Sequence, residues 1–115
     1  MPRPIVFFDI AGTDDVALKT FYADAFDWQV DGTGRISVPV SGPLSGSIRR
    51  DPTEKRIYVG VPDVSASLAQ IEKLGGKVHM PRFEVPGVVV LGRFQDPAGN
   101  PMGLVEMDGD RPRIP

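Results

Sequence analysis

The fold is decided by the stretch Ile5-Val6-Phe7-Phe8-Asp9-Ile10, which is bounded by the turn residues Ala11-Gly12-Thr13-Asp14. Its β-branched and aromatic side chains predict a strand. From Asp14 to Phe26 the apolar residues recur at helical spacing, and the acidic pair Asp14-Asp15 suits a helix N-terminus. The chain is therefore predicted to begin with a strand followed by a helix.

The same order of elements occurs twice. Short strands are predicted at residues 28–30, 35–40 and 44–49, separated by turns at residues 31–34 and 41–43. A second strand at residues 57–61 then leads into a helix that starts at Pro62-Asp63 and stops before Gly75-Gly76. Strands at residues 77–80, 88–94 and 102–107 complete a second β-α-β-β-β series, which indicates a tandem duplication.

The alternation of side chains along the two first strands supports the duplication. A shift of 49 positions sets Phe8 on Ile57 and Asp9 on Tyr58. One face is then apolar in both copies, whereas the other carries Phe7 and Asp9 in one copy and Arg56, Tyr58 and Gly60 in the other. We expect a ligand cleft on this mixed polar and aromatic face.

Composition excludes several classes of function. The 115 residues include 13 basic and 15 acidic side chains, so the net charge of −2 supplies no cationic field for nucleic acid or an anionic membrane. The sequence contains no cysteine and one histidine, which excludes disulfides, thiol catalysis and zinc fingers. No apolar run is long enough to span a membrane and no secretory signal is visible, so we expect a cytoplasmic protein.

The order and spacing of several motifs resemble the vicinal oxygen chelate superfamily, the group of glyoxalases, bleomycin-resistance proteins and extradiol dioxygenases. The motifs are the first strand, the helix ending at residues 21–28, Val61-Pro62-Asp63-Val64, Leu74-Gly75-Gly76-Lys77-Val78 and Asp96-Pro97-Ala98-Gly99-Asn100. The resemblance implies an α+β fold, in which two tandem βαβββ modules form a curled mixed sheet around a cleft with the helices outside. It places module one at about residues 4–50, module two at about 56–107 and a C-terminal tail at 108–115, all within one glyoxalase-like domain over residues 1–115.

The resemblance also implies where metal-bearing members hold their ion. Carried over to this sequence, those positions are Phe7, Ser45 or Ser47, Arg56 and Gly103. Metal sites of this kind use imidazole and carboxylate ligands, and an arginine cannot give up its proton to bind a cation. We therefore expect no metal and no cofactor at these positions.

The candidate ligand-binding residues are Phe7, Asp9, Ser47, Arg49, Arg56 and Tyr58. Phe7 and Tyr58 would give apolar contact. Asp9 would act as a general base or be held in an ion pair, and Arg56 would bind an anion, neutralise Asp9 or lie in solvent at a strand end. Arg49 would reinforce a positive cleft or end a solvated hairpin. Asp9 and Arg56 are also the candidates for catalysis.

Other groups have weaker claims. His79 is the single histidine, the side chain type most used for proton transfer near neutral pH, but a lone histidine is more often structural. A relocated metal site would need Asp9, His79, Glu84 and Glu106 together. Trp28 and Phe94 are expected in the core, and residues 82–87 as a rim loop.

We therefore predict a metal-free protein that binds a small molecule and works as a homodimer, with no nucleic-acid or membrane partner. The alternative is a lyase or isomerase of the glyoxalase type, either metal-independent, with Asp9 as base and Arg56 as oxyanion partner, or with relocated metal ligands. A third possibility is a structural or regulatory partner domain.

Overall fold

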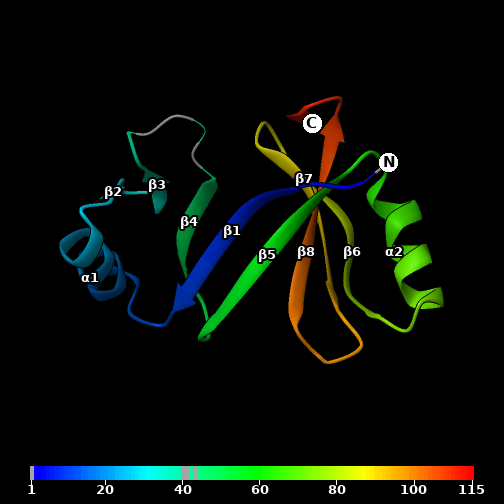
Figure 1. Ribbon diagram of the computed structural model, residues 1–115, viewed down its shortest axis with the longest axis horizontal. Helices are drawn as coiled ribbons and strands as arrows, with labels where there is room; N and C mark the ends of the chain where they lie inside the picture. Colours follow the sequence, from blue (N-terminus) through cyan, green and yellow to red (C-terminus); the bar gives the residue numbers. More distant parts are fainter. Residues whose placement is uncertain (1, 40–41, 43) are drawn as a thin grey trace. The chain divides into compact units, whose positions relative to one another are not determined.

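The computed structural model describes residues 2–39, 42 and 44–115, and the chain divides into two compact units (Figure 1). The N-terminal unit is Phe7–Arg56. The C-terminal unit comprises Ile57–Pro115 together with Met1–Val6. Each unit contains one helix and its own series of strands.

The N-terminal unit contains β1 (Ile5–Gly12, from its third residue), α1 (Asp15–Phe26), β2 (Gln29–Val30), β3 (Arg35–Ser37) and β4 (Ser45–Arg50). Its strands lie in the order β2-β3-β4-β1. β1 runs parallel to β4, and the other pairs are antiparallel. Asp14 caps α1 by accepting a hydrogen bond from the backbone N–H of Ala17 at 3.1 Å, as the acidic pair predicted.

The C-terminal unit repeats this topology. It contains most of β5 (Glu54–Val61), then α2 (Val64–Lys73), β6 (Lys77–Val85), β7 (Val89–Gln95), β8 (Pro101–Asp108) and β9 (Arg111–Pro112). The order β5-β8-β7-β6, with β5 parallel to β8 and the other two pairs antiparallel, matches β1-β4-β3-β2 element for element. The predicted α+β class and the tandem βαβββ order are confirmed. A cleft shared by the two modules stays a prediction.

The core of the C-terminal unit lies between α2 and the sheet. Val64 and Leu68 of α2 pack with Val61, Phe94 and Leu104 in one buried cluster. The predicted core position of Phe94 is therefore confirmed. Asp63 accepts a hydrogen bond from the N–H of Ala66 at 2.9 Å, so the Pro62-Asp63 start of this helix is also confirmed.

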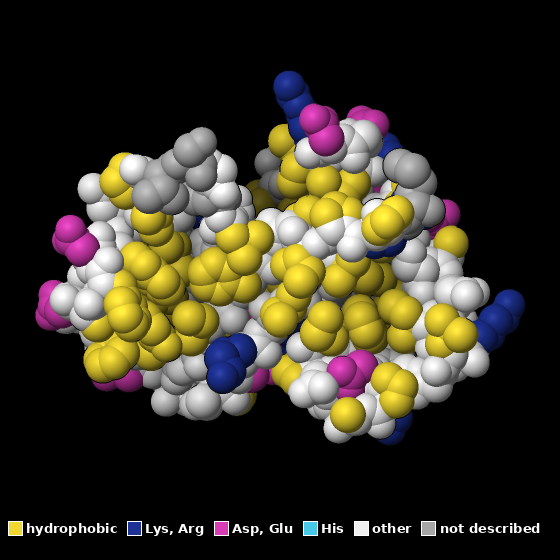
Figure 2. Space-filling model, viewed as in Figure 1, with side chains coloured by type: hydrophobic (Ala, Val, Ile, Leu, Met, Phe, Trp, Pro, Cys, Tyr) yellow, Lys and Arg dark blue, Asp and Glu magenta, His cyan; other side chains and the backbone are white. Residues whose placement is uncertain are grey.

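In the N-terminal unit, α1 is held by aromatic contacts rather than by deep burial. Trp28 stacks on Tyr22 with ring centroids 5.3 Å apart, and Phe8 meets Trp28 edge-on at 6.4 Å. None of the twelve residues of α1, all of which the structure describes, is buried. Val16, Phe21 and Phe26 are each more than 60% exposed, and Figure 2 shows apolar side chains gathered over this part of the unit.

Three segments differ from the sequence-based expectation. The prediction of a rim loop at residues 82–87 is wrong, because β6 continues to Val85 and only a tight turn joins it to β7. The tail folds back: β9 pairs with β8, and the N–H of Gly87 bonds to the carbonyl of Pro115. β3 ends at Ser37, whereas Val40, Ser41 and Pro43 of the predicted strand and turn lie outside the described residues. Among the residues that are described, no helix is long and apolar enough to cross a membrane.

Candidate functional site

One face of the N-terminal sheet gathers most of the predicted site residues. Asp9 of β1 lies beside Ser47 of β4, and Ser47 lies beside Arg35 of β3. Phe7 pairs with Ser45 in the adjacent row. Partners in register share a face, which here is the face opposite Phe8 and Trp28. We call this surface the polar face; its members are Phe7, Asp9, Arg35, Ser45, Ser47 and Arg49.

Arg35 is fixed at the edge of the polar face by the turn that precedes it. Asp31 accepts hydrogen bonds from the N–H groups of Thr33 and Arg35 and from the Thr33 hydroxyl. The hydrogen bonds from the Thr33 hydroxyl and the Arg35 N–H lower the pKa of Asp31. The Asp31 carboxylate therefore stays charged and keeps the hydrogen bonds that form the turn. The Arg35 guanidinium then lies 5.6 Å from the centre of the Phe7 ring, within the range of a cation–π contact.

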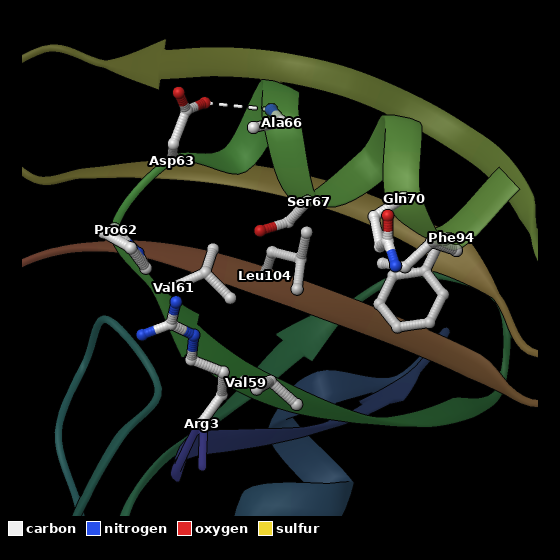
Figure 3. Close-up of a pocket in the computed structure, with 11 residues that line it drawn as sticks. Arg3, Val59, Val61, Pro62, Asp63, Ala66, Ser67, Gln70, Phe94 and Leu104 are labelled. Atoms are coloured by element: carbon white, nitrogen blue, oxygen red, sulfur yellow. Dashed lines mark hydrogen bonds between the residues drawn. The ribbon is translucent and has the colours of Figure 1, made fainter. Parts of the chain in front are cut away.

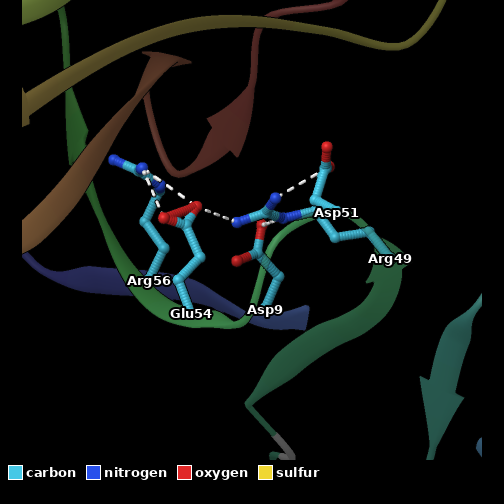
Figure 4. A network of polar contacts seen from close by, with 5 residues as sticks. All are labelled: Asp9, Arg49, Asp51, Glu54 and Arg56. Carbon is cyan, nitrogen blue, oxygen red and sulfur yellow. Dashed lines mark hydrogen bonds and ion pairs between the residues drawn. The ribbon is translucent and has the colours of Figure 1, made fainter. Parts of the chain in front are cut away.

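Arg49 is the centre of an ion-pair network (Figure 4). Its Nε lies 3.0 Å from Oδ2 of Asp9, its Nη1 donates to Asp51 at 2.8 Å, and its Nη2 donates to Glu54. Glu54 in turn accepts from Nη2 of Arg56 at 3.1 Å and 3.3 Å. The guanidinium of Arg49 is thus surrounded by three carboxylates from three segments of the unit.

The network shifts the pKa values of Arg49 and Glu54. Burial lowers the pKa of Arg49, but its contacts with Asp9, Glu54 and Asp51 raise it more, so the pKa lies above its usual value. Desolvation raises the pKa of Glu54, but hydrogen bonds from Arg49 and Arg56 leave it below its usual value. Both side chains therefore remain charged at neutral pH.

The structure narrows the alternatives for two arginines. Arg56 does not lie in solvent: it is only 3% exposed and pairs with Glu54. Arg49 is the partner of Asp9, so a solvated hairpin end describes Arg50 but not Arg49. Asp9 is 3% exposed, as expected for a carboxylate that is held by an arginine.

The weaker candidates are scattered. His79 lies exposed on β6. Glu84 and Glu106 share Arg82, whose Nε donates to Glu106 at 2.8 Å and whose Nη1 donates to Glu84 at 3.3 Å. Within residues 2–39, 42 and 44–115, no three His, Asp or Glu side chains form a group that could hold a metal ion. The relocated metal site at Asp9, His79, Glu84 and Glu106 is therefore not formed.

The sequence profile of one family, described as "Glyoxalase-like domain", matches residues 5–105. The chain belongs to the glyoxalase-like domain family. This confirms the resemblance to the vicinal oxygen chelate superfamily. A mycobacterial relative named "Putative glyoxylase CFP32" is 29% identical over 111 residues in both Mycobacterium bovis and Mycobacterium tuberculosis. The alignment covers 84% of this chain and 42% of those relatives, so the chain spans less than half of their length.

Solved structures of several other proteins show the same fold. Hypothetical protein BH1468 from Bacillus halodurans has a TM-score of 0.68 at 11% identity, covering 94% of this chain and 96% of that one. A methylmalonyl-CoA epimerase in complex with methylmalonyl-CoA has a TM-score of 0.63 at 17% identity, with 98% and 100% coverage. The methylmalonyl-CoA epimerase from Mycobacterium tuberculosis has a TM-score of 0.62 at 14% identity, with 90% and 87% coverage. At these low identities, the similarities show a shared fold only.

The positions implied for a metal in the glyoxalase-like family do not fit one here. Phe7 lies under Arg35, and Arg56 is bound to Glu54. Gly103 pairs with Tyr58, and a methyl group added at Gly103 would come within 2.4 Å of the Tyr58 ring, so no ligating side chain fits there. Ser45 and Ser47 would be left as weak neutral ligands.

Sequence reasoning missed two members of this glyoxalase-like site. Glu54, which joins the two arginines, was assigned to the link between modules, whereas β5 begins at Glu54. Arg35 was placed in a strand without a role. The signal for Arg35 is the turn Asp31-Gly32-Thr33-Gly34, because such a turn fixes the first residue of the strand that follows.

Proposed function

We propose that this glyoxalase-like domain binds a small organic anion on the polar face of its N-terminal unit, without a metal ion. The observation that carries the proposal is Arg35. Its guanidinium lies over Phe7, and among the described residues no carboxylate is within ion-pair distance of it. The charge of Asp31 acts on Arg35 only at longer range than an ion pair. A guanidinium without a direct ion pair among the described residues, next to an aromatic ring and two serine hydroxyls, is suited to a carboxylate or phosphate on a flat apolar body.

The ion-pair network around Arg49 holds the strands that carry this site. Arg49 already contacts three carboxylates, so a ligand anion would have to displace one of them. We therefore assign Arg49, Asp9 and Glu54 to holding β1 and β4 in place, and we assign ligand contact to Arg35, Phe7 and Ser47. Ligand contact by Arg56 and Tyr58 stays a prediction.

The alternative is a lyase or isomerase in which Asp9 is the general base. A general base must accept a proton from the substrate, but Oδ2 of Asp9 faces the guanidinium of Arg49 at 3.0 Å. Binding without chemical change, which the resemblance to bleomycin-resistance proteins implies, is the function that we prefer.

The test is a binding titration with benzoate and its neutral analogue benzamide. We expect saturable binding of benzoate, weaker binding of benzamide, and about a tenfold loss of benzoate affinity in Arg35→Ala, since a charge-assisted contact is lost. Arg50→Ala, an exposed arginine on β4, is the matched control. Equal affinity of Arg35→Ala and Arg50→Ala for benzoate would refute the site. Stoichiometric Zn, Ni, Mn or Fe in protein purified without chelator would refute its metal-free character.

We also propose that two copies associate through α1. Val16, Phe21 and Phe26 expose apolar surface of the kind that association covers. Light scattering should give the mass of a dimer for the natural chain and of a monomer for Phe21→Ser/Phe26→Ser. A monomeric natural chain would refute this proposal. A cytoplasmic location stays a prediction.

A further inference from the structure

A hollow lies in the C-terminal unit, on the side of the strands that α2 covers (Figure 3). It has a volume of about 450 Å³ and lies between α2 and strands β5 and β8. We call it the α2 groove. Its size falls in the range of small-molecule sites, roughly 300–1,000 Å³. All residues that line it belong to the C-terminal unit, so it is separate from the polar face.

The walls of the α2 groove are apolar and rigid. Val59, Leu104 and Phe94 come from three paired strands, and Ile71 comes from α2. Phe94 and Leu104 are part of the buried cluster, whereas Val59 and Ile71 pack against it and remain only half-buried. An apolar molecule in the groove would cover Val59 and Ile71 without disturbing the packing beneath them.

Four polar side chains border the same groove: Arg3, Asp63, Ser67 and Gln70. Ser67 and Gln70 lie on α2, one turn apart. Arg3 extends from the N-terminal segment toward Val61 (Figure 3). This segment is tied to β5, because the N–H of Gly60 bonds to the carbonyl of Pro4 at 2.9 Å. The position of Arg3 at the groove is thus set by the sheet.

One positively charged side chain, that of Arg3, borders the groove. Asp63 also borders it, but one oxygen of its carboxylate is used by the N–H of Ala66 at the start of α2. In the part of the chain that the structure describes, the side chains of Arg3, Ser67 and Gln70 have no ion-pair or hydrogen-bond partner. An apolar channel that ends at an arginine, with a hydroxyl and an amide along one wall, matches a carboxylate on an unbranched chain.

We propose that the α2 groove binds an amphipathic monocarboxylate of medium chain length, with its alkyl chain on Val59, Ile71 and Phe94 and its carboxylate at Arg3. The site does not depend on the polar face, and its ligand is an alkyl acid rather than a flat aromatic anion. The opposite orientation would place the carboxylate near Phe94, where the bordering side chains are apolar apart from the Gln70 amide.

The experiment is a titration of the protein with octanoate, in which binding is measured by calorimetry and by backbone amide NMR. We expect saturable binding with shifts in α2, β5 and β8, and we expect 1-octanol to bind at the same place. Arg3→Ala should weaken octanoate about tenfold and leave 1-octanol unchanged, because only the charged contact is lost. Arg111→Ala, an exposed arginine of the same unit, should change neither.

Two alanines of α2 provide a matched pair for the apolar part. Ala66 borders the groove and Ala69 does not, although both are exposed. Ala66→Phe should weaken octanoate and 1-octanol together, whereas Ala69→Phe should weaken neither. Circular dichroism of each variant before titration would show that α2 is intact.

Several results would overturn the proposal. Absence of saturable octanoate binding would do so, as would equal losses in Ala66→Phe and Ala69→Phe. Loss of octanoate binding in Arg35→Ala would place the acid on the polar face instead. A dimer that Ala66→Phe converts to a monomer would assign the groove to a second copy of the chain. Because benzoate tests the polar face and octanoate the α2 groove, failure of one leaves the other standing.

Discussion

The Nε atom of Arg49 lies 3.0 Å from Oδ2 of Asp9, and this contact joins β4 to the strand that runs parallel beside it. The same guanidinium also holds Asp51 and Glu54, which follow β4 and begin β5. Two arginines and three carboxylates leave the network with a net charge of −1. An additional anion would find no unused charge there, which is why we place the ligand at Arg35.

Replacement of Arg49 by methionine should destabilise the protein strongly. The side chain keeps its length, but Asp9 loses its arginine in a buried setting and Glu54 loses one of two. Breaking a buried pair from one side costs about 3–5 kcal/mol, and since Arg49 is partly exposed we expect ~2–4 kcal/mol. Urea unfolding measures the change.

Arg50→Met is the control for this substitution, because Arg50 is the exposed neighbour on the same strand. Its effect should stay within about 0.5 kcal/mol. Similar free energies of unfolding for Arg49→Met and Arg50→Met would show that the network does not stabilise the unit.

Gly103→Ala should also destabilise the protein, through a clash rather than a lost bond. The added methyl group would lie 2.4 Å from two ring atoms of Tyr58, which is 2% exposed and has little room to move. Overpacking of this kind costs about 1–3 kcal/mol. Thermal unfolding of the natural chain and the variant would measure the loss.

Gly32→Ala is the matched control, because a methyl group there meets nothing within 4 Å. It should leave the melting temperature nearly unchanged. If Gly103→Ala melts no lower than Gly32→Ala, the close packing of Tyr58 on Gly103 does not hold in solution, and a ligating side chain at residue 103 would no longer be excluded.

Most of the fold could be predicted from the sequence because two local signals agree in both copies. The alternation in Ile5–Ile10 and Ile57–Val61 and the capping residues Asp14 and Asp63 fix a strand and a helix start 49 residues apart. The boundaries at residues 82–87 could not be predicted, because Arg82 and Glu84 look like loop residues in the sequence. In the structure, Arg82 is instead held by Glu106 of β8.

The candidate site could be predicted only in part, for a related reason. Alternation correctly placed Phe7 and Asp9 on one face of β1, together with Ser47 and Arg49 of β4. Which carboxylate pairs with which arginine depends on strand order and on where β5 begins, and neither is encoded locally. The sequence offered Arg56 as one possible partner of Asp9, and the parallel pairing of β1 with β4 brings Arg49 to it.

Arg35→Ala should leave the fold intact while it removes the ligand contact. Arg35 is exposed, and the turn before it is closed through its backbone N–H rather than its side chain. We expect a change in unfolding free energy of about 0.5 kcal/mol or less, together with the loss of benzoate affinity. A large loss of stability would mean that Arg35 on Phe7 is a structural contact.

Acid should weaken the C-terminal unit through Glu106. A hydrogen bond from Arg82, opposed by desolvation and aided by the N–H of Val64, lowers the pKa of Glu106 from 4.5 to about 2. A lowered pKa in the folded state means that the unfolded chain takes up the proton more readily. The stabilising contribution is therefore complete above about pH 5 and is lost as the pH falls toward about 2.

The substitution Glu106→Gln tests whether the stability of the protein falls with pH through this carboxylate. The variant should have a lower urea midpoint than the natural chain at pH 7. The difference should shrink as the pH falls toward about 3, because the unfolded natural chain then takes up a proton at Glu106 that the folded chain does not yet bind. Glu84→Gln is the control, since Glu84 meets the same Arg82 but is largely exposed. A difference for Glu106→Gln that stays constant from pH 7 to about pH 3 would mean that the loss comes from packing, and that the carboxylate charge does not hold β6 to β8.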